Sequence, residues 1–170
     1  MSLAATPALR EGDTIAVVAP AGPVPMKRLA PALTLLEKHY RVLVADDIGR
    51  TEGFLAGNDE RRAAEFNQAL QDPDVRCIWA ARGGYGCSRM AQFLDGDAMR
   101  KDPVPIVGFS DLTVLLSWAA TLGFRSVHGP VLTQFAELDA ADQNWMLGLL
   151  RGEEGEGPFA TTASAAEGGP

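Results

Sequence analysis

Short apolar runs alternate along this chain with longer segments whose apolar residues recur at helical spacing. The runs from Thr14 to Ala19 and from Val75 to Ala80 are rich in strand-forming residues and apolar on both faces. Continuous apolar runs of this kind are typical of parallel strands that are covered on both sides. The pattern predicts strands at 14–19, 41–45, 75–80, 105–109 and 125–128.

The segments between these runs carry helix signals. Leu29, Leu33 and Leu36 recur at helical spacing, and Asn58 is a typical N-cap before an acidic first turn. Gly123 is typical of the residue just past a helix C-terminus. The signals predict helices at about 25–40, 58–72, 88–94, 111–122 and 140–150.

Strands that alternate with helices at these spacings predict an α/β fold, a flavodoxin- or Rossmann-like parallel sheet with helices on both faces. Ligands of such sheets bind at the carboxyl ends of the strands, where the turns at 20–22 and 82–86 and Ser110 would lie. We expect one α/β domain over residues 1–150. Residues 151–170 are expected to form a linker, because nearly all are Gly, Ala, Glu, Ser, Thr or Pro.

Composition then narrows the classes of function. Of the 170 residues, 46% are hydrophobic and 22% charged, which is ordinary for a globular domain. The net charge of −7 argues against a nucleic-acid partner and against an anionic membrane surface. No apolar run approaches the roughly 18 residues of a membrane span. The first residues show no signal-peptide pattern, so we expect a cytoplasmic protein.

The pattern marks neither a metal site nor a cofactor site. Cys77 and Cys87 form no CxxC pair, and His39 and His128 lie far from both in the sequence. Structural zinc sites need such ligand spacing. A nucleotide site is weakly supported, because the sequence has neither G-x-G-x-x-G nor Gly-Lys-Ser/Thr. We therefore expect no metal and no cofactor.

Ser110 is the strongest candidate for a catalytic residue. It stands between a short buried strand and a helix beginning at Asp111, and a serine on such a turn can present its hydroxyl at the tip of a sheet. Amides at the start of the helix can stabilise an oxyanion there. The alternative is that Ser110 only caps the helix. No convincing base accompanies it: His39 is expected on a solvent face, and a structural role is the simpler interpretation of His128.

The glycine-rich turn Arg82-Gly83-Gly84-Tyr85-Gly86 either offers N–H donors to a ligand or is simply a tight turn that needs positive φ. Arg82 can pair with a carboxylate through two parallel hydrogen bonds. Cys87 is a rival nucleophile if a helix N-terminus lowers its thiol pKa, and a buried, inert cysteine is the alternative.

Five segments together resemble a known family. They are Gly12 to Gly22, Gly53 to Arg61, Ala81 to Gly86, Val107 to Asp111, and His128 to Pro130. In this order they resemble the LD-carboxypeptidases, also called muramoyltetrapeptide carboxypeptidases. Each segment alone is a modest signal, and the ordered set is specific.

The resemblance implies a cytoplasmic serine peptidase of peptidoglycan recycling. Such enzymes remove the terminal D-alanine from a muropeptide tetrapeptide, they require no metal, and they are commonly homodimers. The family uses a Ser-His-Glu triad, in which Ser110 matches the nucleophile. The N–H groups of Asp111 and Gly84 would form the oxyanion hole.

Arg82, Gly83 and Tyr85 would line the substrate cleft in the same resemblance. The triad histidine and glutamate of the family come from a second, carboxyl-terminal domain, so the resemblance does not make His128 the base. Residues 151–170 would then lead toward a domain that this sequence lacks. A serine hydroxyl is a weak nucleophile without an adjacent base, so we expect the 170-residue chain to be inactive alone.

Two alternatives stay open. Within the family, an immunity-type hydrolase cleaves an amide between a peptide or aspartate and a nucleotide, and it would share Ser110 and the glycine-rich turn. In a different class, a non-catalytic α/β module would bind a small ligand at the glycine turns, and Ser110 would only cap a helix.

Overall fold

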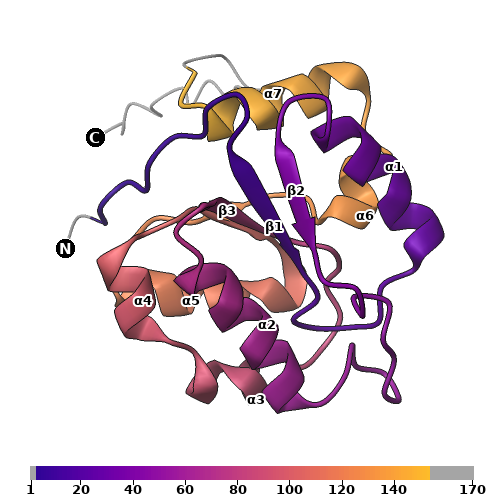
Figure 1. Cartoon of the computed structure of the whole chain (residues 1–170), viewed down its shortest axis with the longest axis vertical. Helices are drawn as coiled ribbons and strands as arrows, with labels where there is room; N and C mark the ends of the chain where they lie inside the picture. The colour runs from indigo at the N-terminus through magenta and orange to yellow at the C-terminus, as the bar shows by residue number, and fades with distance from the viewer. Residues whose placement is uncertain (1–2, 154–170) are drawn as a thin grey trace, which may run out of the picture.

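A computed structural model describes residues 3–153, so the expected linker lies outside the described residues from position 154 onward. Within that range the sheet is parallel throughout, in the order β2-β1-β3-β4-β5, which is the flavodoxin-like order (Figure 1). The strands are β1 (Thr14–Val18), β2 (Arg41–Val44), β3 (Val75–Ala80), β4 (Ile106–Gly108) and β5 (Val127–His128). The predicted fold class is confirmed, and each predicted strand is present within its predicted bounds.

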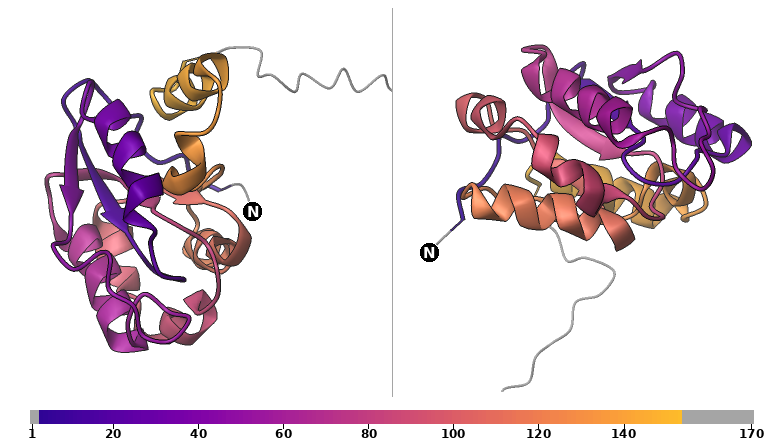
Figure 2. Two further views of the ribbon diagram at one scale, coloured as in Figure 1. Left: turned by 90° about the vertical axis from the view of Figure 1, so that its right-hand side faces the viewer. Right: turned by 90° about the horizontal axis from the view of Figure 1, so that it is seen from below.

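Helices cover both faces of the sheet, as the apolar strands require. One face is covered by α1, α6 and α7, and the opposite face is covered by α2 to α5. Figures 1 and 2 show this arrangement from three sides. In chain order the helices are α1 (Met26–Leu36), α2 (Asp59–Gln71), α3 (Cys87–Met90), the 3₁₀ helix η1 (Ala91–Phe93), α4 (Gly96–Lys101), the 3₁₀ helix η2 (Ser110–Leu112), α5 (Thr113–Thr121), α6 (Leu132–Phe135) and α7 (Ala140–Leu150).

The helix predictions differ from the structure in three respects. The helix predicted to reach residue 40 ends at Leu36, because the chain turns there to bury Tyr40 at the start of β2. The helix predicted at 88–94 is split into α3 and η1. Sequence periodicity missed α4 and α6, which span six and four residues and are too short to show a repeat.

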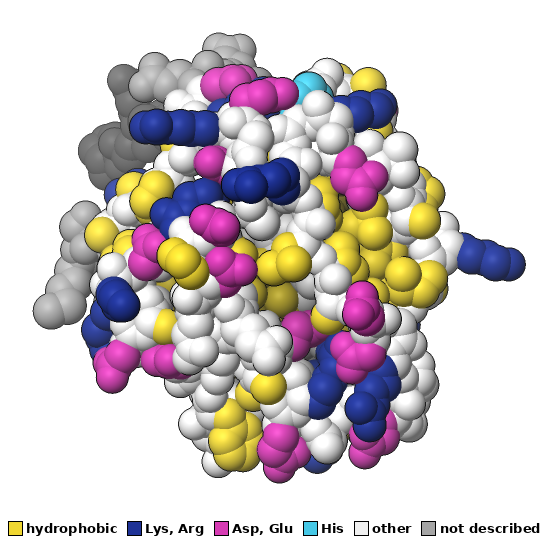
Figure 3. Space-filling model, in the orientation of Figure 1, with side chains coloured by type: hydrophobic (Ala, Val, Ile, Leu, Met, Phe, Trp, Pro, Cys, Tyr) yellow, Lys and Arg dark blue, Asp and Glu magenta, His cyan; other side chains and the backbone are white. Residues whose placement is uncertain are grey.

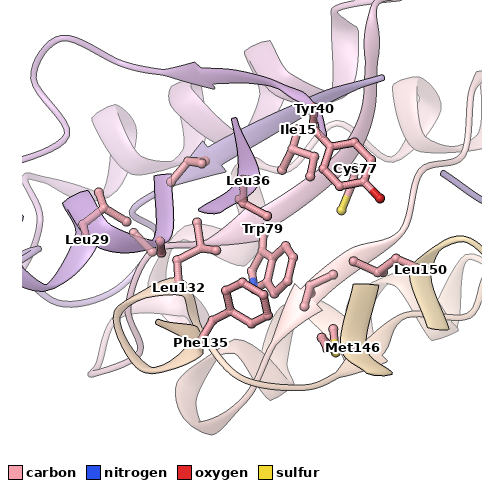
Figure 4. Close-up of a cluster of buried hydrophobic side chains, with 14 of the residues drawn as sticks. Ile15, Leu29, Leu36, Tyr40, Cys77, Trp79, Leu132, Phe135, Met146 and Leu150 are labelled. Carbon is pink, nitrogen blue, oxygen red and sulfur yellow. The ribbon is translucent and has the colours of Figure 1, made fainter. Parts of the chain in front are cut away.

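Alternate residues of the strands point to opposite faces of the sheet and pack into two separate hydrophobic cores. Ile15 and Val17 face α1, α6 and α7, whereas Ala16 and Val18 face α2 to α5. In the first core the ring centroids of Trp79 and Phe135 are 5.0 Å apart. Figure 4 shows these two rings next to each other in the cluster of buried side chains. The indole Nε1 of Trp79 also donates to the carbonyl of Pro130 at 2.8 Å. This bond ties β3 to the loop that follows β5, beside the candidate site.

The sheet order reverses between β1 and β3, so the chain leaves these neighbouring strands toward opposite faces. The loops that follow them meet: the Gly22 amide donates to the Gly83 carbonyl at 3.2 Å. The carboxyl ends of the strands point down in Figure 1 and toward the viewer in the right panel of Figure 2. This is the edge where ligands of doubly wound sheets bind.

Charged side chains of both signs are interspersed on the face in Figure 3, with no continuous basic stripe. Nucleic-acid binding depends on such a stripe, so this face adds no support for a nucleic-acid partner. Between residues 3 and 153, no helix combines the length and apolar character needed to cross a membrane.

Candidate active site

Ser110 is held in a left-handed backbone conformation. Its φ is +62°, and no other non-glycine residue from 3 to 153 has a positive φ. Strain of this kind costs about 1–3 kcal/mol and is concentrated at functional sites. Phe109, not Ser110, occupies the N-cap position of η2, so the interpretation of Ser110 as a helix cap is wrong. The exposed Ser110 stands at a sharp strand-to-helix turn, the position of a serine nucleophile in α/β hydrolases.

The tightness of this turn depends on Gly108, two residues before the serine. A Cβ atom at Gly108 would lie 2.8 Å from Cγ of Leu112, which is itself fully buried. Leu112 therefore packs directly on the end of β4, and the chain reverses within a few residues. The packing of one apolar side chain thus helps to hold Ser110 at the rim of the sheet.

The glycine-rich turn after β3 packs against Ser110. A Cβ atom at Gly83 would lie 3.3 Å from Cβ of Ser110 and 3.5 Å from its Oγ. Gly84 has φ +137°, and a Cβ atom there would lie 2.9 Å from the nitrogen of Gly22. The turn is therefore wedged between the nucleophile loop and the loop after β1, and side chains at either glycine would disturb it.

Two backbone amides beside Ser110 lack a protein partner among the residues that the structure describes. Within residues 3–153, neither the Gly84 N–H nor the Asp111 N–H donates to a protein oxygen. The carboxylate of Asp111 accepts from the Cys87 amide at 2.8 Å, which ties the nucleophile loop to the end of the glycine-rich turn. Unpaired amides next to a strained serine are the donors that an oxyanion would need.

A shallow cavity of about 260 Å³ lies beside the serine. It is lined by Arg28, Arg82, Gly83, Gly84, Phe109, Ser110, Val131 and Gln134. The sequence pattern does not mark Arg28 and Gln134, because charged and polar positions on short or amphipathic helices look alike whether they face a ligand or solvent. Tyr85 does not line this cavity, and its ring packs on the exposed Phe54 at 5.8 Å.

Two guanidinium groups give the cavity a positive lining. Arg28 is held by Glu137, with both nitrogen–oxygen distances at 3.0 Å. Arg82 donates from Nη1 to the Pro23 carbonyl at 2.6 Å. Since no carboxylate pairs with Arg82 within the described range, its charge is the more available one for an anionic ligand.

Within residues 3–153, neither histidine forms a hydrogen bond with Ser110. His39 contacts Glu11 at 3.1 Å on the exposed surface near the start of β1, at the opposite edge of the sheet, as expected of a solvent-facing residue. His128 is exposed and lies edge-to-face with Phe109, the ring centroids 6.3 Å apart. No side-chain hydrogen bond within residues 3–153 reaches Oγ of Ser110.

Cys87 lies at the start of α3, where a helix N-terminus could lower the pKa of a thiol, but its surroundings have the opposite effect. It is fully buried, and its Sγ contacts the Pro20 carbonyl at 3.7 Å. Burial raises the pKa of the Cys87 thiol far above its usual range, and the nearby Asp111 carboxylate raises it further. The structure confirms that Cys87 is buried, and both effects argue against its role as a rival nucleophile.

We expect Ellman's reagent at pH 8 to leave the Cys87 thiol of the native chain unmodified, because the thiolate is suppressed and the sulfur is enclosed. A Cys77→Ala variant makes the measurement specific, since Cys77 and Cys87 are the free cysteines. One thiol is expected to react after denaturation. Rapid labelling of the native variant would contradict the assignment of Cys87 as inert.

A sequence profile described as LD-carboxypeptidase N-terminal domain matches residues 15–129. The chain belongs to the LD-carboxypeptidase family. The matched range holds all five strands of the sheet apart from the first residue of β1, together with Ser110 and the glycine-rich turn. The family resemblance carried by the five sequence segments is thus confirmed.

Individual LD-carboxypeptidase relatives agree with this assignment. The chain is 37% identical over 124 residues to the murein tetrapeptide carboxypeptidase of Pseudomonas aeruginosa, covering 70% of this chain and 39% of that protein. It is 36% identical over 134 residues to the "Probable murein peptide carboxypeptidase" of Bacillus subtilis, covering 78% and 42%. The chain thus spans about two fifths of the length of these curated relatives.

A solved structure in the same fold belongs to the microcin C7 self immunity protein MccF, in complex with aspartyl sulfamoyl adenosine. The TM-score is 0.79 at 27% sequence identity, and the match covers 92% of this chain and 48% of that one. The likeness therefore extends over nearly all of this chain and about half of the MccF chain.

Proposed function

We propose that the complete protein is a serine carboxypeptidase that releases the terminal D-alanine of muropeptide tetrapeptides in cytoplasmic peptidoglycan recycling. Ser110 is the nucleophile in this proposal. The observation that carries it is the strained Ser110 beside the amides of Gly84 and Asp111, which donate to no protein oxygen within residues 3–153. The name of the Pseudomonas aeruginosa relative supports a murein tetrapeptide as the substrate.

In the proposed reaction, Oγ of Ser110 attacks the carbonyl carbon of the amide that precedes D-alanine. The proton of the hydroxyl passes to a base, and the carbonyl oxygen becomes an oxyanion that accepts hydrogen bonds from the amides of Gly84 and Asp111. Collapse breaks the amide bond, and the base returns the proton to the departing D-alanine amine. Water then hydrolyses the acyl-enzyme.

The base must come from outside the described residues in this proposal. Within residues 3–153 neither His39 nor His128 forms a hydrogen bond with Ser110, and the chain spans about two fifths of the length of its curated relatives. We place the triad histidine and glutamate in a second domain, reached through residues 151–170 from the nucleophile-bearing domain of residues 1–150. A homodimer and the inactivity of the 170-residue chain are parts of the same proposal.

Arg82 is assigned to the free carboxylate at the end of the substrate peptide, with Gly83 as a neighbouring contact. Tyr85, which lies outside the cavity beside Ser110, is assigned to a part of the substrate beyond that cavity. Arg82 lines the cavity beside Ser110, and its guanidinium is not paired with a carboxylate within residues 3–153. A guanidinium offers the planar pair of donors that fits a carboxylate. Selection of a free terminus is what distinguishes a carboxypeptidase from a peptidase that cuts within a chain.

Arg82→Lys is expected to lower kcat/KM for the tetrapeptide about tenfold or more, because a lysine keeps the charge and loses the paired donors. The specific measurement compares the tetrapeptide with its carboxyl-terminal amide. The wild-type protein should prefer the free acid, and the variant should lose most of that preference. Arg125→Lys is the control, since Arg125 is also exposed and donates to one carbonyl, that of Leu3, remote from Ser110. An unchanged acid-to-amide ratio in Arg82→Lys would contradict the assignment.

An immunity-type amide hydrolase is the second candidate. The likeness to MccF, solved with aspartyl sulfamoyl adenosine, favours it, because that ligand joins an amino acid to a nucleoside. The nucleophile and oxyanion donors would be the same in both reactions. The difference lies in the group that departs from the substrate carbonyl, so substrate identity decides between the candidates.

The deciding experiment incubates the complete protein, its Ser110→Ala variant and the 170-residue chain with a murein tetrapeptide and with an aspartyl sulfamoyl adenosine. Release of D-alanine by the complete protein, but not by the Ser110→Ala variant or the 170-residue chain, supports the proposal. Cleavage of the nucleoside conjugate alone favours the immunity-type reaction. A fluorophosphonate probe tests for a nucleophilic serine independently. Failure of both substrates and of the probe would favour the non-catalytic binding module.

A further inference from the structure

Arg62 is the one fully buried charged residue between residues 3 and 153. It lies on α2, and its guanidinium donates to carbonyls of three separate loops. Nε donates to Gly57 at 3.2 Å, and Nη1 donates both to Pro20 at 2.5 Å and to Gly86 at 2.9 Å. These carbonyls lie before α2, after β1 and at the end of the glycine-rich turn.

The charge of Arg62 is balanced inside the protein. Asp59 accepts from Nη2 of Arg62, and its other oxygen accepts from Nε of Arg89 at 2.9 Å. A buried ion pair is weak evidence for stability, because apolar residues of similar volume often serve the core as well or better. The hydrogen bonds from the Arg62 guanidinium to carbonyls of three loops therefore point to a role in positioning those loops.

We propose that Arg62 is a positioning residue that holds the turn from Gly83 to Gly86 in place and thereby aims the Gly84 amide at the oxyanion. This inference rests on the proposed function of Ser110. Gly86 has φ +119°, and a Cβ atom there would lie 2.8 Å from Nη1 of Arg62. The guanidinium thus occupies the space beside the turn and fixes the end of it directly.

Arg62 also holds the loop after β1, against which the glycine-rich turn packs. Because one nitrogen, Nη1, bridges the carbonyls of Pro20 and Gly86, the loop after β1 and the turn are held at a set spacing. The bond from the Gly22 amide to the Gly83 carbonyl, at 3.2 Å, depends on that spacing. Oxyanion donors contribute most when they are placed before the reaction begins, so an ordered turn lowers the barrier.

The first test measures kinetics of the complete protein. Arg62→Lys keeps the positive charge, and its single ammonium cannot reproduce the planar set of donors. We expect kcat for D-alanine release to fall about tenfold or more with little change in KM, because the oxyanion forms only in the transition state. Arg76→Lys is the matched control: Arg76 also bonds a carboxylate and a carbonyl, Asp102 at 2.6 Å and Pro73 at 2.7 Å, and it lies at the start of β3.

The second test measures amide hydrogen exchange in the complete protein in the absence of substrate. The amides of Gly22 and Cys87 report on the turn, because they donate to Gly83 and Asp111 at 3.2 and 2.8 Å. Arg62→Lys should speed exchange at both sites about tenfold or more, while amides within β3 keep their protection and Arg76→Lys leaves the turn unchanged.

Asp59→Asn is the milder variant, and it decides the question if Arg62→Lys does not fold. It removes the charge that orients the guanidinium and is expected to act in the same direction by a smaller factor. Unchanged exchange at Gly22 and Cys87 overturns the proposal, and so does faster exchange with an unchanged kcat. Absence of D-alanine release from the wild-type protein contradicts the proposed function instead, and the exchange measurement then still decides whether Arg62 orders the turn.

Discussion

Ser110→Ala is expected to lower D-alanine release by the complete protein on the order of 10⁶-fold, because removal of the nucleophile costs about as much as removal of a whole triad. The variant should still bind the tetrapeptide, since the cavity is lined by the remaining residues, among them Arg28 and Arg82. The measurement is kcat under saturating substrate, with binding followed by calorimetry. Residual activity within a hundredfold of wild type would rule out Ser110 as the nucleophile.

Stability measurements on the same position separate catalysis from folding. With φ at +62°, Ser110 and an alanine in its place are both strained, whereas glycine adopts this conformation readily. Ser110→Gly should therefore raise the free energy of unfolding by about 1 kcal/mol and abolish activity. Ser110→Ala should leave stability nearly unchanged. A fall in stability for both variants would contradict the strain at this turn.

Gly84→Ala is expected to lower kcat/KM by about 10²–10³, the usual loss when one oxyanion donor is removed. The physical reason is steric: the new Cβ atom would lie 2.9 Å from the nitrogen of Gly22 and 3.0 Å from its Cα. Both contacts are with backbone, so no side chain can move aside and the turn itself must shift. The alanine must also adopt φ +137°, which adds strain.

Gly123→Ala is the matched control for that experiment. Gly123 has φ +97°, and a Cβ atom there would meet nothing within 4 Å. The control is expected to lose about 1 kcal/mol of stability from backbone strain and to keep its activity. Steady-state kinetics and thermal unfolding of both variants check this pair of results. Activity of Gly84→Ala within a few-fold of wild type would remove Gly84 from the oxyanion hole.

The elements of the sheet were predictable because their signals are local. Runs that are apolar on both faces, such as Val75–Ala80, need a covered parallel strand wherever they lie, and Asn58 does cap α2 through the Arg61 amide. Short helices escaped prediction: α4 begins because the Asp95 carboxylate accepts from the amides of Asp97 and Ala98. That signal spans a few residues and shows no periodicity.

Arg61 and Arg62 show where local signals end. They are neighbours on α2 and look alike in the sequence. Arg61 pairs with Asp47 at 2.7 Å and Glu65 at 3.1 Å, and its side chain keeps 13% of its surface exposed. Arg62 is fully buried against three loops. Helical rotation turns adjacent residues about 100° apart, and only the packed neighbours decide what each one meets.

The α/β fold class, the family resemblance and the position of Ser110 between a strand and a helix follow from the order of residues, because hydrophobic period, turn residues and motif order are properties of the chain alone. The strain at Ser110, the burial of Cys87 and the close packing of Gly84 against Gly22 become visible once the chain is folded. Burial and close contact join residues far apart in sequence, so they arise only when the loops after β1, β3 and β4 are brought to one edge of the sheet.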